Sequence, residues 1–196
     1  MFWIYHDRPV GFLFALLATN FLAASVHDCV GAMHVGADPA FLDSLQTSVM
    51  APRFIAVGIG SPVSAGQTED GRDWSGVRGR HVYDLKKRVN EAYVGVERPC
   101  KTAVHERGHQ VFVLLAFTPG WESLYTRIDN SDAARIFPED AYCQNSDMPQ
   151  EYFACASQVW CGVYEKKVGR LSDELATVMK TVYGADCRMP SRSESR

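Results

Sequence analysis

The chain has 196 residues, of which 46% are hydrophobic and 22% are charged, a composition typical of a globular protein with one core. Its formal net charge is −3 and its isoelectric point is near 6.1, so the charge balance gives no electrostatic support for binding to nucleic acid or to an anionic membrane surface. Two complete domains would be difficult to accommodate in this length.

The amino-terminal segment is typical of an export signal. An apolar run, GFLFALLATNFLAAS at residues 11–25, follows Arg8 and ends in small residues. The run is too short to span a bilayer comfortably, and its end, Ala23-Ala24-Ser25, resembles a signal-peptidase site. We therefore predict a signal peptide at residues 1–25 and a secreted mature domain at 26–196, with no stable membrane insertion after cleavage. The alternative is an uncleaved anchor.

Short β-type runs come first in the mature chain. Residues 53–59, 81–85 and 92–96 are rich in β-branched and aromatic side chains and are predicted to be strands. A stretch rich in Gly, Ser and Asp, residues 61–80, is predicted to be a long loop between the first two strands.

Three helices are predicted to follow. Residues 101–117 have a helical pattern that Thr118-Pro119-Gly120 ends. The stretch SDMPQEYFACASQVW is predicted to form a second helix with Asp147 as its N-cap. A third helix is capped by Ser172, has an apolar stripe and ends at Gly184, and a polar tail follows it. Strands followed by helices predict an α+β domain: a small twisted sheet, then a central helix and carboxy-terminal helices.

All six cysteines lie after the proposed cleavage site: Cys29, Cys100, Cys143, Cys155, Cys161 and Cys187. An even number in an exported chain predicts up to three disulfides and leaves the pairing open. The spacing is too irregular for a zinc finger, and an oxidising compartment favours disulfides over metal ligation. Cys100 and Cys143 each lie just before a predicted helix, so disulfides there would hold loops around a cleft.

The central predicted helix contains the sequence HERGH, which matches H-E-x-x-H. Residues four apart share one helix face, so His105 and His109 can both direct a ring nitrogen at one metal ion. Glu106 flanks that face, where a carboxylate can take a proton from zinc-activated water. The spacing predicts a Zn²⁺ site with Glu106 as general base. The alternative is a chance match on a half-exposed polar helix face.

A catalytic zinc site usually has a third protein ligand. The extended form of the motif, with a Gly and a further His, is excluded because those positions hold Phe112 and Leu115. The strongest candidate is Glu151, in the first turn of the second predicted helix. The sequence therefore predicts three metal ligands from two helices.

An H-E-x-x-H helix followed by E-[YF]-F-A resembles the catalytic domain of anthrax lethal factor and the related Pro-Pro endopeptidases. In this chain the two motifs are HERGH and EYFA, and the similarity covers about residues 50–185. The resemblance implies a zincin-like fold, with Glu106 as general base and three zinc ligands: His105, His109 and Glu151. It also implies that a strand beside the cleft pairs with an extended peptide, and we assign this role to AYVGV at residues 92–96.

Three positions depart from the family pattern. Cys155 stands where the family usually has a second Glu that hydrogen-bonds the second zinc histidine, so the support of His109 must differ or be weaker. Gln144 stands where the family has a Tyr that stabilises the oxyanion. Tyr142, two residues earlier, can fill this catalytic role if the loop shifts; the alternative is a packed surface aromatic. Arg107 is unusual inside the motif, at a position that can face solvent.

Two functions from different classes follow. The first is a secreted zinc-dependent metalloendopeptidase acting on a peptide or protein substrate. The alternative is a catalytically inactive zincin-like domain that binds a peptide or protein, which the departures at Cys155, Gln144 and Arg107 favour. A structural disulfide-rich protein would require the motif to be accidental.

Overall fold

The computed structural model describes residues 29–56, 79–94, 99–145, 147–185 and 187–189. Within these ranges the chain combines a small sheet with several helices, which confirms the α+β prediction. The predicted signal peptide, most of the predicted loop at residues 61–80 and the polar tail lie outside the described residues. None of the described helices is long and apolar enough to cross a membrane.

One sheet contains three strands: β1 (Arg53–Ala56), β2 (Gly79–Asp84) and β3 (Val89–Val94). Their order is β1-β3-β2, with β3 parallel to β1 and antiparallel to β2. All three predicted strands are confirmed with shifted bounds. Residues along β3 alternate between half-buried and buried because one face of the strand packs on a helix.

The central position of β3 corrects one prediction. Residues 92–94 pair with β1 on one side and with β2 on the other, so their backbone groups are already hydrogen-bonded. The prediction that the AYVGV segment offers a cleft edge to a peptide is therefore wrong. Among the described strands, β2 is the edge strand on the side where the motif lies.

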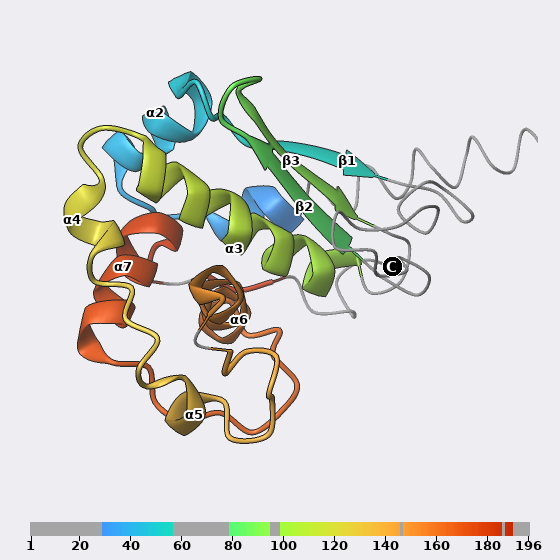
Figure 1. The fold of residues 1–196 in the computed structure, drawn as a ribbon, viewed down its shortest axis with the longest axis vertical. Helices are drawn as coiled ribbons and strands as arrows, with labels where there is room; N and C mark the ends of the chain where they lie inside the picture. The colour runs from blue at the N-terminus through green and yellow to red at the C-terminus, as the bar shows by residue number, and fades with distance from the viewer. Residues whose placement is uncertain (1–28, 57–78, 95–98, 146, 186, 190–196) are drawn as a thin grey trace, which may run out of the picture.

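Helix α3 (Pro99–Phe117) carries the HERGH motif and lies between the sheet and helix α6 (Pro149–Trp160), as Figure 1 shows. Most of its side chains are buried, the polar ones included, because neighbours cover it on several sides. Helices α3 and α6 can approach each other closely because residue 108, on the side of α3 that faces α6, is a glycine. A Cβ atom on Gly108 would lie only 2.6 Å from the Cα atom of Ala154 in α6.

The start of α6 differs from the prediction. The helix begins at Pro149 and its N-cap residue is Met148, which makes no side-chain capping bond, so the prediction of Asp147 as N-cap is wrong. Proline fits the first helical position because its missing N–H would have no partner there. The Asp147 backbone N–H instead bonds the side chain of Asn145.

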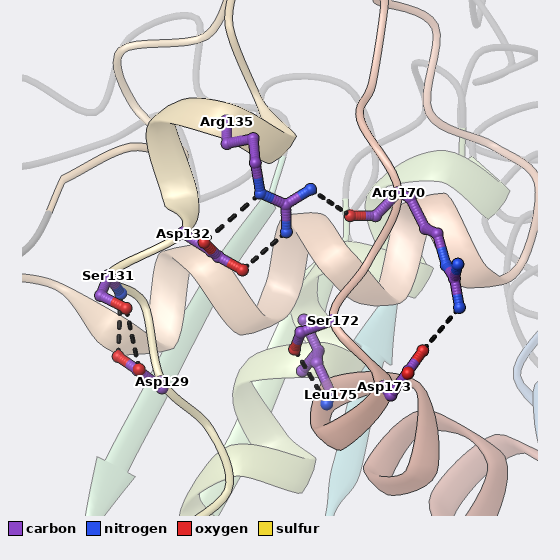
Figure 2. A network of polar contacts seen from close by, with 8 residues as sticks. All are labelled: Asp129, Ser131, Asp132, Arg135, Arg170, Ser172, Asp173 and Leu175. Atoms are coloured by element: carbon purple, nitrogen blue, oxygen red, sulfur yellow. Dashed lines mark hydrogen bonds and ion pairs between the residues drawn. The ribbon is translucent and has the colours of Figure 1, made fainter.

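The remaining helices are α2 (Pro39–Thr47), α4 (Glu122–Tyr125), α5 (Ala133–Ile136) and α7 (Asp173–Tyr183). Figure 2 shows the confirmed cap of α7, where the hydroxyl of Ser172 accepts a hydrogen bond from the N–H of Leu175 at 3.2 Å. The same view shows Arg135 of α5 bonded to Asp132 and to the carbonyl of Arg170. These bonds tie α5 to the segment before α7.

Three disulfides join the six cysteines, as predicted: Cys29–Cys100, Cys143–Cys155 and Cys161–Cys187. The first attaches a helical segment at residues 29–33 to the start of α3. The second attaches the connector before α6 to α6 itself, and the third attaches the end of α6 to the segment after α7. Of the two predicted disulfides that would hold loops around a cleft, Cys143–Cys155 holds the connector before α6, whereas Cys29–Cys100 joins a helical segment to α3, in which Cys100 itself lies.

Candidate metal centre

The three predicted metal ligands converge at the interface of α3 and α6. The Nε2 atom of His105 lies 3.2 Å from the Nε2 atom of His109 and 3.2 Å from the Oε2 atom of Glu151. The Nε2 atom of His109 lies 3.3 Å from the same carboxylate oxygen. These atoms form a nearly equilateral triangle, and the three side chains are the group of described residues whose ligand atoms could hold one metal ion.

The size of this triangle fits a zinc ion. In a tetrahedral site with zinc bonds of about 2.0–2.1 Å, ligand atoms lie about 3.3–3.4 Å apart. The observed separations of 3.2–3.3 Å match that spacing. Two imidazole nitrogens and a carboxylate oxygen all carry lone pairs, so a proton or a metal ion is needed between them. Two His and one Glu are also a donor set that zinc uses in catalytic sites.

Hydrogen bonds orient two of the three ligands. Burial raises the pKa of Glu151, but hydrogen bonds from His105 and His109 outweigh it and hold the pKa well below its usual range. The side chain of Gln158 in α6 hydrogen-bonds the ring of His105 and donates to the carbonyl of Lys101. The contact with Gln158 helps to orient the His105 ring.

Glu106 lies on the side of α3 that faces β2. The residue is only 5% exposed, and burial raises the pKa of its carboxyl above its usual value despite the neighbouring His105 and His109. Gly79 of β2 leaves the space that this carboxylate occupies, because a Cβ atom there would lie 2.6 Å from Oε1 of Glu106. A buried carboxylate with a raised pKa beside a metal triangle has the properties of a general base.

Tyr142 lies beside His105. Its ring stacks on His105 with centroids 6.3 Å apart, and half of the residue is exposed. The Cys143–Cys155 disulfide anchors its connector to α6. Gln144 has a different role, because its amide donates to the carbonyl of Phe137 and so holds the connector. The structure thus brings Tyr142, and not Gln144, to the ligand cluster.

Arg107 does not face solvent, which corrects the sequence prediction. It is 8% exposed, its guanidinium lies 4.8 Å from the ring centroid of Phe54 in β1, and it donates to the side chain of Gln110. Burial lowers its pKa to about 10, which still leaves it charged at neutral pH. The prediction failed because an isolated helix would expose this position, whereas α3 is covered there.

Sequence reasoning missed one histidine next to the cluster. His81 of β2 stacks parallel to His109, with centroids 5.6 Å apart and an interplanar angle of 5°. Burial and the nearby His109 lower the pKa of His81 to about 4, so this ring is neutral at pH 7. The alternation Gly79, His81, Tyr83 along β2 could have indicated that the three residues share one face.

No protein-family model, curated protein or solved structure matches this chain. The resemblance to the lethal factor and Pro-Pro endopeptidase family stays a prediction.

Proposed function

We propose that this protein is a zinc-dependent metalloendopeptidase with a zincin-like fold. The observation that carries the proposal is the convergence of His105, His109 and Glu151 within 3.2–3.3 Å, with the buried carboxylate of Glu106 beside them. If HERGH matched the motif only by chance, there would be no reason for a carboxylate from a second helix to lie next to both histidines.

The chain's own residues have distinct parts in the proposed reaction. Zinc held at this place would supply a Lewis acid that polarises the scissile carbonyl and lowers the pKa of a water molecule to about 7. Glu106 takes the proton of the attacking water and passes it to the leaving amine. Tyr142, whose ring covers His105, donates a hydrogen bond to the oxygen on which negative charge develops.

The edge strand β2 is the element best placed to align a peptide. Gly79 lies against Glu106, His81 stacks on His109, and Tyr83 stacks on Phe117 at the end of α3. The strand therefore runs alongside the motif, and one of its edges is not paired with any described strand. An extended peptide can add to such an edge through backbone hydrogen bonds.

Secretion is part of the same proposal. Three disulfides are typical of proteins that fold in an oxidising compartment. Together with the apolar run at residues 11–25, they support a mature protein that begins near Val26.

The second candidate function is an inactive domain that binds peptide. The disulfide at Cys155 favours it, because this cysteine cannot supply the carboxylate that the family uses behind His109. Measurements of bound zinc and of peptide cleavage on the same protein separate the two candidate functions.

The test uses purified, disulfide-bonded mature protein loaded with zinc and incubated with a peptide library. We expect about one zinc per chain from the three-ligand geometry, and none in His109→Ala. Glu106→Gln removes the base but keeps the shape, so it should retain zinc and lower peptide cleavage by about 100-fold or more. Zinc binding without cleavage would favour the inactive domain. A wild-type protein without zinc, or full cleavage by Glu106→Gln, would refute the proposed mechanism.

A further inference from the structure

The plane of the His109 ring has little support from hydrogen bonds. Its Nε2 atom faces His105 and Glu151, and none of the described residues hydrogen-bonds its other ring nitrogen. The ring of His105 meets it edge-on, with centroids 4.9 Å apart and planes at 84°. Among the described residues, the ring that lies parallel to it is His81, from the sheet. A metal-bound histidine is usually oriented by a hydrogen bond at its distal nitrogen, so here the parallel ring of His81 is the contact that can orient His109 instead.

His81 is itself held in one orientation. Its Nε2 atom lies 2.8 Å from Oδ1 of Asn90, in the adjacent strand β3. The amide nitrogen of Asn90 donates to the carbonyls of Met50 at 2.8 Å and Gln110 at 3.1 Å. With both donors of the amide used, its oxygen can only accept, so the Nε2–H of His81 is the donor. This bond fixes both the tautomer and the plane of the His81 ring.

The same network reaches back to the helix beside His109. Gln110 follows His109 in α3, is fully buried, and donates through its side chain to the carbonyls of Arg53 at 2.8 Å and Asn90 at 3.1 Å. Asn90 therefore contacts the backbone of α3 one residue after His109 and also carries the acceptor for His81. The buried side chains of Asn90 and Gln110 thus connect the His81 ring to the backbone of α3 next to His109.

We propose that His81 is a positioning residue that holds the imidazole of His109 in its metal-binding orientation by parallel stacking. This inference rests on the proposed metal centre, but its physical basis is the stack and the Asn90 bond. A histidine suits the position because its Nε2–H anchors the ring plane, whereas an aliphatic side chain would leave His109 free to rotate. Stacked rings of this kind contribute energy beyond the area that they bury.

The experiment measures zinc affinity by competition with a chromophoric chelator in wild type, His81→Ala, His81→Phe and Val82→Ala. Loss of a group that orients a metal ligand typically costs about 10- to 100-fold in affinity, which is the expected effect of His81→Ala. His81→Phe keeps a flat ring against His109 but loses the bond to Asn90, so it should recover part of the loss. Val82→Ala is the matched control, because it shortens the neighbouring residue of β2, whose side chain alternates to the other face of the sheet. It should bind zinc like wild type.

Two further measurements separate positioning from folding and from the metal proposal. Thermal unfolding of the metal-free variants should show that His81→Ala is folded under the assay conditions; if it is not, His81→Phe decides the question. Nitrogen-15 NMR of the metal-free protein should show one ordered state for the His109 ring in wild type and an averaged state in His81→Ala. This readout holds even if wild type binds no zinc, an outcome that would refute only the proposed function. Wild-type zinc affinity and an unchanged His109 spectrum in folded His81→Ala would overturn the inference, as would a His81→Phe variant as weak as His81→Ala.

Discussion

The two sides of helix α3 differ in what they contribute to the candidate site. Toward α6, the helix approaches so closely that His105 and His109 meet a carboxylate from the second helix. Toward β2, the same helix presents Glu106 to a glycine and His109 to a stacked histidine. One five-residue motif thus depends on two separate interfaces. In the proposed site, the helix–helix interface brings the three candidate ligands together, and the helix–sheet interface holds the proposed base and stacks a ring on His109.

The largest expected effect is on the α6 side, from Gly108→Ala. Because the new methyl group would lie 2.6 Å from the backbone of Ala154, α3 and α6 must move apart and Glu151 must leave the two histidines. Overpacking of this kind typically lowers the free energy of unfolding by about 1–3 kcal/mol. We expect this destabilisation in chemical denaturation, together with loss of zinc binding and of peptide cleavage.

The matched control for this substitution is Gly31→Ala. Gly31 is exposed in the helical segment at residues 29–33, and a Cβ atom there would meet no other atom within 4 Å. The control should leave zinc binding unchanged and raise the free energy of unfolding by up to about 1 kcal/mol, since alanine is the better helix former. If Gly108→Ala behaves like this control, the close approach of α3 and α6 does not determine the metal centre.

A smaller effect is expected from Tyr142→Phe, also on the α6 side. The substitution keeps the ring that stacks on His105 and removes the hydroxyl proposed to contact the developing negative charge. Loss of one such donor typically lowers kcat by about 100- to 1,000-fold. Zinc content and unfolding temperature should not change. Steady-state cleavage of a fluorogenic peptide measures the effect, and an unchanged kcat would assign Tyr142 to packing alone.

The smallest effect is expected on the β2 side, from Gly79→Ala. Its new methyl group would clash with the Cγ2 atom of Thr102 and would lie 2.6 Å from the Glu106 carboxylate oxygen, both side-chain atoms of α3, so these side chains and not the backbone must shift. Small displacements of catalytic groups can lower rates by up to about 100-fold, so we expect roughly a tenfold lower kcat with zinc content unchanged. Val82→Ala, whose side chain alternates to the other sheet face, should behave like wild type. Loss of zinc from Gly79→Ala would mean that the two interfaces are not independent.

Local patterns were sufficient to predict much of the fold. The helical period and end residues located α3 and α7, and short runs rich in β-branched and aromatic residues located all three strands. The prediction missed α2, although Asp38 caps it and Pro39 opens it, both of which are start signals readable from sequence. It also misplaced the cap of α6 by one residue, although proline favours the first helical position and Pro149 therefore marks Met148 as the cap.

The failures inside the site share one cause. Arg107 is buried, His81 is adjacent to a ligand and β3 lies at the centre of the sheet, and each of these facts depends on contacts between distant segments. Disulfide pairing belongs to the same class, because the spacing of six cysteines permits many connections.

By itself, the sequence determined that His105 and His109 share one face of a helix with Glu106 at its flank, because an α-helix repeats every 3.6 residues whatever surrounds it. It also singled out Glu151, but not the distance at which that carboxylate would lie. Only the tertiary structure decided that distance, since it depends on how closely α6 packs against Gly108. The order of the strands likewise decided which edge can meet a peptide and which side chains face the motif, because strand pairing is a contact between segments far apart in the chain.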